Sequence, residues 1–371
     1  MVEAGLHRRR RVRATARRRD GRHDVVGQRA RHCDASRPHA RARARTRTRR
    51  AVSSRPAAGP ERRRRIVLDC DPGVDDTLAI LTAARYGDLT GITTVNGNVS
   101  VDHTTRNALA VTQIAQLDIP VHRGADRPLV APMHGATRVH GVTGFGTVAH
   151  PELLRGETSD DAVGYLLEMS RAYDDLDVVA VGPLTNIALA VRRDPGFLAR
   201  LRSLTIMGGA ANGLGNVTAV AEFNIWTDPE AAAIVLEGRV TPALIPLNLT
   251  HQVMASATTI ERLRSAATAT SVLAAHTVAI AVEGKSALHD PCAVLAVTHC
   301  ELFGLRPRYV AIELTGTHTR GMTVVDERRH SPSVPNALVG YDVDAATALE
   351  LIVDACRDPF RSGTETTKTM P

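Results

Sequence analysis

The stretch VLDCDPGVDDTLAI, residues 67–80, decides the fold and the chemistry that we expect of this chain. It joins an apolar run to a helical pattern through four carboxylates, Asp69, Asp71, Asp75 and Asp76. Carboxylates this close together repel one another, and each loses hydration when it is buried. Pro72 and Gly73 turn the backbone sharply and direct Asp71 back toward Asp76. Several carboxylates that face one point form an oxygen-rich site for a hard divalent cation, which removes the repulsion.

The last two of these aspartates also have a purely structural interpretation. Asp75 and Asp76 stand where a helix begins, so they can cap free N–H groups and meet the positive end of the helix dipole. That interpretation leaves Asp69 and Asp71, at the end of an apolar strand, unexplained. Magnesium and calcium both accept such ligands, and calcium is better suited to several protein oxygens combined with substrate oxygens. We therefore expect a site for a divalent metal ion.

Basic residues are concentrated at one end of the chain. Residues 1–65 contain 23 arginines against five acidic residues, whereas acidic residues outnumber basic ones in the remainder. The net charge of +7 therefore gives no support for nucleic-acid binding by the rest of the chain. Without Phe, Tyr or Trp, residues 1–65 cannot bury enough surface to order themselves, and we expect a disordered extension. A polyanion-binding arm and a translation start near residue 60 both stay open as interpretations.

The cysteines and the hydropathy bear on the compartment. Five scattered cysteines include no C-x-x-C pair, which argues against a zinc ribbon or a disulfide framework and for a reducing cytoplasm. No apolar region of a signal peptide follows the arginines, and no run approaches the roughly 18 apolar residues of a membrane span. We expect a cytoplasmic protein with no membrane anchor.

Short β-rich runs alternate with helical patterns from residue 66 onward. The runs that predict strands are IVLDC (66–70), LTGITTV (89–95), IPVHRG (119–124), LDVVAVG (176–182), LTIMGG (204–209) and TPALIPLN (241–248). Helical patterns cover 75–87, 101–116 and 344–357, and three late runs (308–314, 321–326 and 337–343) have the pattern of added edge strands. This alternation predicts an α/β fold, a Rossmann-like open and mostly parallel sheet with flanking helices. One domain over residues 66–360 and a flexible tail over 361–371 follow.

Polar motifs fall where the predicted strands end. DCDPGVDD (69–76), NGN (96–98), VGPLTN (181–186) and MGG (207–209) each follow a strand. Because ligands of open α/β sheets bind beyond the carboxyl ends of the strands, these motifs predict one shared site.

Three further segments add candidates. Asp290 is a plausible distant metal ligand with His289 beside it, although such a pair also fits a helix cap. Asn216, Glu222 and Asn224 lie in GNVTAVAEFNIWTDPEAA (215–232); amides and carboxylates suit hydroxyl-rich ligands, and loop-stabilising hydrogen bonds are the alternative. HGVTGFG (140–146) has the glycine content of a mobile lid.

DCDPGVDD resembles the N-terminal signature of the inosine–uridine-preferring nucleoside hydrolases. The resemblance continues through TTVNGN (93–98), RGADRPL (123–129), HGVTGFG, VGPLTN, MGG, AEFNIWTDPEAA (221–232) and HDP (289–291). It extends in order over residues 66–357. It implies a Rossmann-like domain that hydrolyses the N-glycosidic bond of ribonucleosides with calcium, and a homodimer or homotetramer.

The resemblance also implies residue roles. Calcium would be held by Asp71, both oxygens of Asp76, the backbone carbonyl of Val181, and Asp290. The ribose 2′- and 3′-hydroxyls and one water would complete its shell, and Asp71 would take a proton from that water. Asp75 and Asn98 would bind the 2′-hydroxyl side of the sugar. Other substrate contacts would come from Asn216, Glu222, Asn224, Met207 and His140. His289 would lie on the leaving-base side as an acid, and Asp69 would support the metal loop.

Two positions depart from the family pattern. Asn248 stands where an aspartate is common, and the predicted helix over residues 274–290 contains no tyrosine for base contact, leaving His276 to occupy part of that space. These departures put the base preference in doubt and leave the metal and ribose positions intact.

Two other functions remain as alternatives. One is a nucleoside- or pentose-binding protein without turnover, for which a substitution at Asp71 would be the marker. The other is a haloacid-dehalogenase-like phosphatase, because Asp69 and Asp71 have its Asp-x-Asp spacing, although Gly73 stands where Thr or Val is expected.

Overall fold

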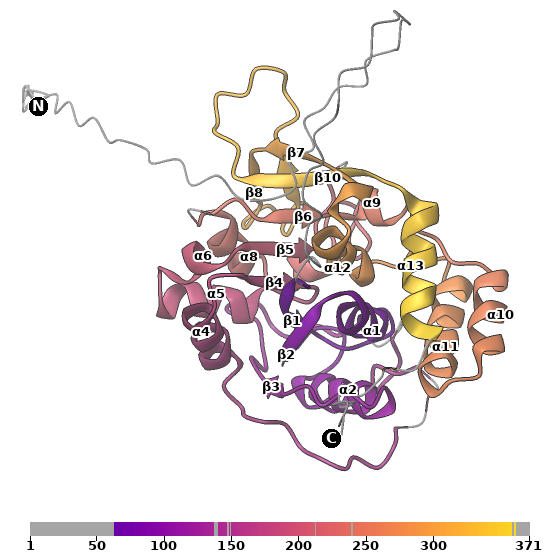
Figure 1. Cartoon of the computed structure of the whole chain (residues 1–371). Helices are drawn as coiled ribbons and strands as arrows, with labels where there is room; N and C mark the ends of the chain where they lie inside the picture. Colours follow the sequence, from indigo (N-terminus) through magenta and orange to yellow (C-terminus); the bar gives the residue numbers. More distant parts are fainter. Residues whose placement is uncertain are drawn as a thin grey trace, which may run out of the picture.

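The computed structural model describes residues 63–136, 140–146, 148, 150–211, 213–238, 240–357 and 360. One eight-stranded sheet organises this part of the chain, in the order β3-β2-β1-β4-β5-β6-β10-β7 (Figure 1). Its strands are β1 (Arg65–Cys70), β2 (Asp88–Thr94), β3 (Val121–Arg123), β4 (Leu176–Ala180), β5 (Ser203–Met207), β6 (Ala243–Ile245), β7 (Phe303–Arg308) and β10 (Ala337–Val343). All neighbouring pairs are parallel except β10 and β7. The predicted α/β fold with a mostly parallel sheet is confirmed.

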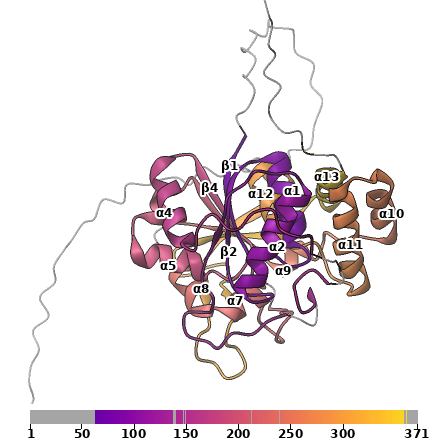
Figure 2. The same cartoon turned by 90° about the horizontal axis from the view of Figure 1, so that it is seen from below.

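Helices cover both faces of the sheet (Figures 1 and 2). One face carries α1 (Asp76–Tyr86), α2 (Val101–Ile114), α10 (Ala257–Ala266), α11 (Ala269–Glu283), α12 (Asp290–Thr298) and α13 (Ala345–Arg357). The other carries α4 (Ala162–Ala172), α5 (Thr185–Arg193), α6 (Phe197–Arg200) and α8 (Pro229–Leu236). The short helices α7 (Phe223–Thr227) and α9 (Leu247–Thr250) and the 3₁₀ turn η1 (Cys300–Leu302) complete the connections. Because both faces are covered, the central strands are buried nearly throughout, as parallel sheets require.

The strand order changes direction beside β1. From β1 the chain adds β2 and β3 on one side, and then returns to place β4 on the other side. The carboxyl ends of β1 and β4 therefore border the crevice where the connections diverge, which is the place where open α/β sheets bind ligands. The segment 71–76 follows β1 and the segment 181–186 follows β4, so the topology brings these two motifs together.

The late strands differ from the prediction. β10 lies between β6 and β7, and the edge position belongs to β7, of which the sequence pattern indicated only the last residue. Pro307 and the exposed Arg306 of β7 are tolerated because an edge strand leaves one side unpaired. The runs around β8 (Val310–Ile312) and β9 (Thr323–Val325) form a separate antiparallel pair instead of extending the sheet.

Two predicted boundaries were also wrong. The strand predicted over 241–248 ends at Ile245, because Pro246 is the N-cap residue of α9. The helix predicted over 274–290 ends with α11 at Glu283, and a turn with Lys285 at a φ of 52° separates it from α12.

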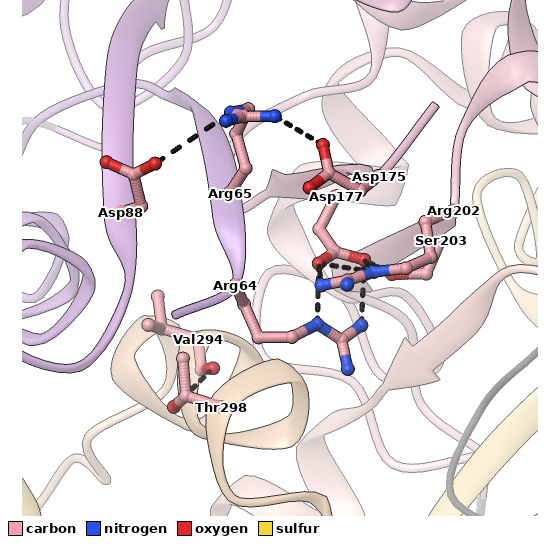
Figure 3. Close-up of polar contacts among 9 residues, drawn as sticks. All are labelled: Arg64, Arg65, Asp88, Asp175, Asp177, Arg202, Ser203, Val294 and Thr298. Carbon is pink, nitrogen blue, oxygen red and sulfur yellow. Dashed lines mark hydrogen bonds and ion pairs between the residues drawn. The ribbon is translucent and has the colours of Figure 1, made fainter. Parts of the chain in front are cut away.

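The folded part begins slightly earlier than predicted, inside the range 1–65. Arg65 starts β1 and forms ion pairs with Asp175 and Asp88, and Arg64 donates to both oxygens of Asp177 at 2.7 and 2.8 Å (Figure 3). Arg64 is held because Asp177 is fully buried and its charge requires a partner. The rest of the predicted extension, residues 1–62, and the predicted tail over 361–371 lie outside the described residues.

None of the helices in the described part of the chain combines the length and the apolar character that crossing a membrane requires.

Candidate active site

The turn after β1 is closed by the side chain of Asp76. Its Oδ1 accepts the backbone N–H of Asp71 at 3.1 Å, and its Oδ2 accepts that of Gly73 at 3.0 Å. Asp75 is the N-cap residue of α1, but its side chain makes no capping hydrogen bond. The turn predicted from Pro72 and Gly73 therefore does fold Asp71 toward Asp76, and the capping interpretation of Asp75 is wrong.

Asp75, Asp76 and Asp290 come together in space. One carboxylate oxygen from each lies within 4.8 Å of the others, and Asp76 and Asp290 are buried. Asp290 opens α12, so its carboxylate reaches the group from a helix more than 200 residues further along the chain than α1. A distant aspartate was expected here, whereas Asp75 was expected to contact only the sugar.

Asp71 lies beside this group in a narrow space. A Cβ at Gly97 would lie 2.1 Å from Asp71 Oδ2, and a Cβ at Gly182 would lie 2.6 Å from Oδ1. Oδ2 accepts the backbone N–H of Asn98 at 2.7 Å, while Oδ1 is buried and has no hydrogen-bond partner among the described residues. The two glycines let the strand ends of β2 and β4 approach this carboxylate, which keeps one oxygen available.

Burial and mutual repulsion oppose ionisation of these carboxyl groups. Burial, and next the charge of Asp76, raise the pKa of Asp71 well above its ordinary value. Burial and then Asp75 raise the pKa of Asp76 to about 7, and the same two causes raise the pKa of Asp290 strongly. A divalent cation would offset this cost, because its charge favours the ionised form of every ligand.

A second layer of polar residues supports the turn. Asp69 accepts hydrogen bonds from Thr93 Oγ1 at 2.6 Å and from Asn186 Nδ2 at 2.8 Å, and burial raises its pKa to about 6. Asn186 also donates to the carbonyl of Thr94 and accepts from Ala125 N–H. Asn186 lies in the VGPLTN motif, but no role was predicted for it. The only signal in the sequence was its place at the end of a predicted strand.

The predicted sugar-binding residues divide into buried and exposed ones. Asn224 Nδ2 donates to the backbone carbonyl of Val181 at 2.8 Å, and it also reaches the carbonyl and the sulfur of Met207 at 3.3 and 3.6 Å. One lone pair of the Val181 carbonyl remains available to a cation. Asn216 is exposed, and its Oδ1 accepts the N–H of Phe223, so the structure keeps it outside the buried cluster.

Glu222 is buried, and backbone groups occupy both of its oxygens. It accepts the N–H groups of Gly209 at 3.0 Å, Asn224 at 3.0 Å and Ile225 at 3.1 Å. Burial raises its pKa to about 7, against the effect of these donors. Glu222 thereby joins the loop after β5 to the start of α7.

Asn98 forms hydrogen bonds with the turn after β1. Its Nδ2 donates to the carbonyl of Asp71 at 3.1 Å and to Asp76 Oδ2 at 3.2 Å. The amide therefore holds the Asp71 backbone and the Asp76 carboxylate together, a role that was not predicted for it.

Two histidines, the half-buried His289 and the buried His140, stand near the carboxylates. His289 Nδ1 lies 2.7 Å from Thr250 Oγ1, its Nε2 lies 3.2 Å from Ser286 Oγ, and its ring meets that of His251 edge-on with centroids 5.6 Å apart. Burial lowers the pKa of His289, although the charge of Asp75 opposes this. Thr250, Ser286 and His251 were not predicted as site residues. His276, predicted near the base, is exposed on α11 and bonds back to the Val272 carbonyl.

His140 packs on the other side of the turn. Its Nδ1 accepts the backbone N–H of Val74 at 3.0 Å, and a Cβ at Gly73 would lie 2.3 Å from the same atom. Burial lowers the pKa of His140. Because Nδ1 is an acceptor, the neutral ring carries its proton on Nε2.

Asn248, where an aspartate was expected, bridges two segments through both ends of its amide. Its Oδ1 accepts Ala211 N–H at 3.1 Å, and its Nδ2 donates to the carbonyl of Gly340 at 3.1 Å. An aspartate could not make the second bond, so the departure from the family pattern affects packing between α9 and β10.

Known proteins share this architecture. Residues 66–350 match the family model described as inosine-uridine preferring nucleoside hydrolase. The non-specific ribonucleoside hydrolase RihC of Klebsiella pneumoniae is 39% identical over 285 residues, which cover 75% of this chain and 93% of that protein. The pyrimidine-specific ribonucleoside hydrolase RihA of Salmonella arizonae is 37% identical over 302 residues, covering 78% and 97%.

A solved structure agrees with the sequence matches. The purine-preferring ribonucleoside hydrolase from Gardnerella vaginalis superposes with a TM-score of 0.75 at 29% identity, covering 79% of this chain and 98% of that one. With the buried carboxylates at the switch point of the sheet, these matches show that the chain belongs to the inosine–uridine-preferring nucleoside hydrolase family and is a hydrolase that acts on the N-glycosyl bonds of ribonucleosides.

Proposed function

We propose that this hydrolase depends on Ca²⁺ and uses Asp71 as the general base. The observation that carries the proposal is the cluster of Asp75, Asp76 and Asp290 with Asp71 beside it. One buried oxygen of Asp71 has no hydrogen-bond partner in the described part of the chain. Without a compensating charge, ionisation of these carboxyl groups is unfavourable. The cluster therefore supports a bound cation and a reaction that uses the cation together with ionised carboxylates.

The residues present fit a hard cation. Asp71, Asp76 and Asp290 offer carboxylate oxygens, and the Val181 carbonyl keeps one lone pair free beside its bond to Asn224. All of these donors are oxygens, which calcium prefers over nitrogen or sulfur. Bound there, the cation would lower the pKa of a water ligand and stabilise negative charge.

Asp71 is placed to accept a proton. The Asn98 N–H holds its Oδ2, which fixes the carboxylate plane, while its Oδ1 is free to take the proton of the attacking water. Transfer of one proton from the water to Asp71 Oδ1 leaves a hydroxide, which adds to C1′ of the sugar.

The remaining carboxylates act electrostatically. Cleavage of an N-glycosidic bond develops positive charge on the ribose ring, and Asp75 and Asp76 supply negative charge near that position. Asn224, whose donors are committed to Val181 and Met207, offers its amide oxygen to a sugar hydroxyl. For Glu222 we propose a supporting role in place of direct hydroxyl binding, because its oxygens already accept backbone donors.

His289 is the candidate for protonating the departing base. Thr250 and Ser286 contact its two ring nitrogens, so its orientation is fixed. Protonation of a leaving base by a placed acid contributes about 10²–10⁴-fold to the rate.

The base preference is open within the family. Three relatives carry three descriptions in their names, non-specific, pyrimidine-specific and purine-preferring. The wall that would face the base, on α11, presents small and aliphatic residues. For this reason we propose a broad substrate range with weak stacking on the base. A cytoplasmic location and a homodimer or homotetramer stay predictions, the latter testable by light scattering.

One experiment tests the proposal. The full chain is incubated with inosine, adenosine, guanosine, uridine and cytidine, and free base and ribose are quantified with Ca²⁺, after EDTA, and after Ca²⁺ is restored. We expect release that EDTA abolishes and Ca²⁺ restores. Release that is insensitive to EDTA contradicts the metal assignment, and Ca²⁺ binding without release of any base indicates a binding protein without turnover.

A further inference from the structure

A buried asparagine on α2 makes three hydrogen bonds to three different segments. Asn107 is 0% exposed, and its Nδ2 donates to the carbonyl of Pro72 at 2.7 Å and to that of Thr143 at 2.8 Å. Its Oδ1 lies 2.6 Å from His150 Nε2. Two carbonyls can accept only from the NH₂ group, so the amide orientation is fixed and His150 donates to the oxygen.

Two partners of Asn107 lie in two segments: the turn after β1 that carries Asp71, called here the catalytic turn, and the glycine-rich segment 140–146. Pro72 follows Asp71 directly, and Thr143 lies in the middle of residues 140–146. Buried backbone carbonyls in irregular segments need hydrogen-bond donors, and here the side chain of Asn107 supplies them to both segments. Asn107 is therefore a bridge between the turn that carries Asp71 and the segment that carries His140.

The packing around this bridge leaves no room for a side chain. Gly144 has a φ of +88°, and a Cβ there would lie 2.5 Å from Asn107 Nδ2 and 3.1 Å from the Pro72 carbonyl. The next residue, Phe145, is buried and stacks on His150 with ring centroids 4.8 Å apart and an interplanar angle of 6°. The Asn107 hydrogen bond to Thr143, the close packing at Gly144 and the stacking of Phe145 on His150 thus all hold the segment 140–146 in place.

His140 completes the connection at the other end of the segment. It accepts the N–H of Val74, and its carbonyl accepts the N–H of Gly146 at 2.8 Å. Residues 140–146 therefore form a closed turn, attached to the catalytic turn at Val74 and, through Asn107, at Pro72. A shift of one turn must move the other.

We propose that Asn107 is a positioning residue that sets the catalytic turn and the His140 segment in one fixed arrangement. It touches neither Asp71 Oδ1 nor the carboxylate cluster, and it acts through Pro72 and Thr143. The inference rests on the proposed function for its kinetic consequence alone, since the structural consequence is measurable without turnover.

The test uses Asn107→Asp, which keeps the acceptor for His150 and loses both donors. Asn336→Asp is the matched control, because Asn336 also makes three backbone bonds (Leu236 carbonyl 3.1 Å, Val310 carbonyl 2.9 Å, Val310 N–H 2.7 Å) in a segment remote from the site. Hydrogen exchange of peptides that cover residues 140–146 is measured by mass spectrometry. We expect at least tenfold faster exchange there in Asn107→Asp and wild-type exchange there in Asn336→Asp.

Kinetics supply the second readout. Misplacement of reacting groups lowers kcat more than substrate affinity, so we expect kcat to fall at least tenfold in Asn107→Asp with KM changed less than threefold, and kcat to be unchanged in the control. Wild-type exchange of residues 140–146 in Asn107→Asp overturns the proposal, as does a kcat loss no larger than that of the control. If the wild-type protein shows no hydrolysis, the proposed function fails while the exchange result still decides the bridge.

A second variant covers the case in which Asn107→Asp does not fold. Gly144→Ala leaves Asn107 intact and forces the segment away from it, since Cβ would overlap Nδ2. We expect the same local exchange and the same kcat loss from this variant. Unchanged exchange in a folded Gly144→Ala protein overturns the proposal.

Discussion

Asp76 Oδ1 accepts the backbone N–H of Asp71 at 3.1 Å, so the carboxylate at the start of α1 holds the first residue of the turn after β1. The bond fixes two proposed metal ligands in one arrangement before any cation binds. Such preorganisation lowers the cost of assembling a metal site and of placing a catalytic base.

The first prediction concerns Asp71. Asp71→Asn is expected to lower kcat by at least about 10²-fold, because an amide cannot accept the proton of the attacking water. Its oxygen can still accept the Asn98 N–H, so the circular dichroism spectrum should stay that of the wild type. Asp160→Asn, on an exposed side chain, is the control. Turnover within threefold of wild type in Asp71→Asn would remove Asp71 from the role of base.

Calcium removal should be visible in stability. A cation that binds the folded protein alone raises its free energy of unfolding by mass action, by about 2.7 kcal/mol at a hundred times Kd. We expect Ca²⁺ at that concentration to raise the Tm of EDTA-treated protein by about 4 °C, measured by calorimetry. Asp290→Asn should abolish most of this shift, and Asp160→Asn should retain it. A full shift in Asp290→Asn contradicts the ligand assignment.

The orientation of His289 gives a prediction about leaving groups. His289→Ala removes the proposed acid and should slow inosine hydrolysis by about 10²-fold or more. Thr250→Val removes only the group that contacts Nδ1 of His289, so it should slow the reaction less. Hydrolysis of p-nitrophenyl riboside, whose leaving group needs little protonation, should slow less in both variants. Steady-state kinetics on the two substrates decide the matter. Equal losses on both would assign His289 to binding instead of acid catalysis.

Glu222 gives a prediction about pH. Its folded-state pKa of about 7 lies above the ordinary value of 4.5, so the folded protein binds more protons than the unfolded chain between these values. The free energy of unfolding must therefore fall as pH rises from about 4.5 to 7, by about 3 kcal/mol from this group, and stay level above pH 7.

Glu222→Gln tests that sign, because it removes the titrating group. Urea unfolding in EDTA at pH 5, 6 and 7 should show a smaller decline in stability with pH in the variant than in the wild type. The slope is compared instead of the absolute stability, since glutamine also loses an acceptor for backbone N–H groups. Identical slopes would mean that Glu222 is ionised throughout this range.

Part of the site could be predicted from the sequence because the determining contacts are local. Asp71 and Asp76 are five residues apart around Pro72 and Gly73, and the bond between them was predictable from turn chemistry. Asn107 carried no comparable signal, since an asparagine on a helix is usually solvated, and Asn186 was marked only by its place at the end of a predicted strand. Their importance follows from burial against segments 35 to 117 residues away in sequence.

The sequence by itself determined the alternation of strands and helices, and hence a mostly parallel sheet with polar strand ends. It also determined the strand, turn and helix of residues 67–80, since apolar runs, turn residues and helix starts depend on near neighbours. The tertiary structure decided that β7 takes the edge and β10 the interior, and that Asp290 reaches Asp75 and Asp76. Pairing of distant segments depends on which faces bury the most surface together, and no local pattern encodes that choice.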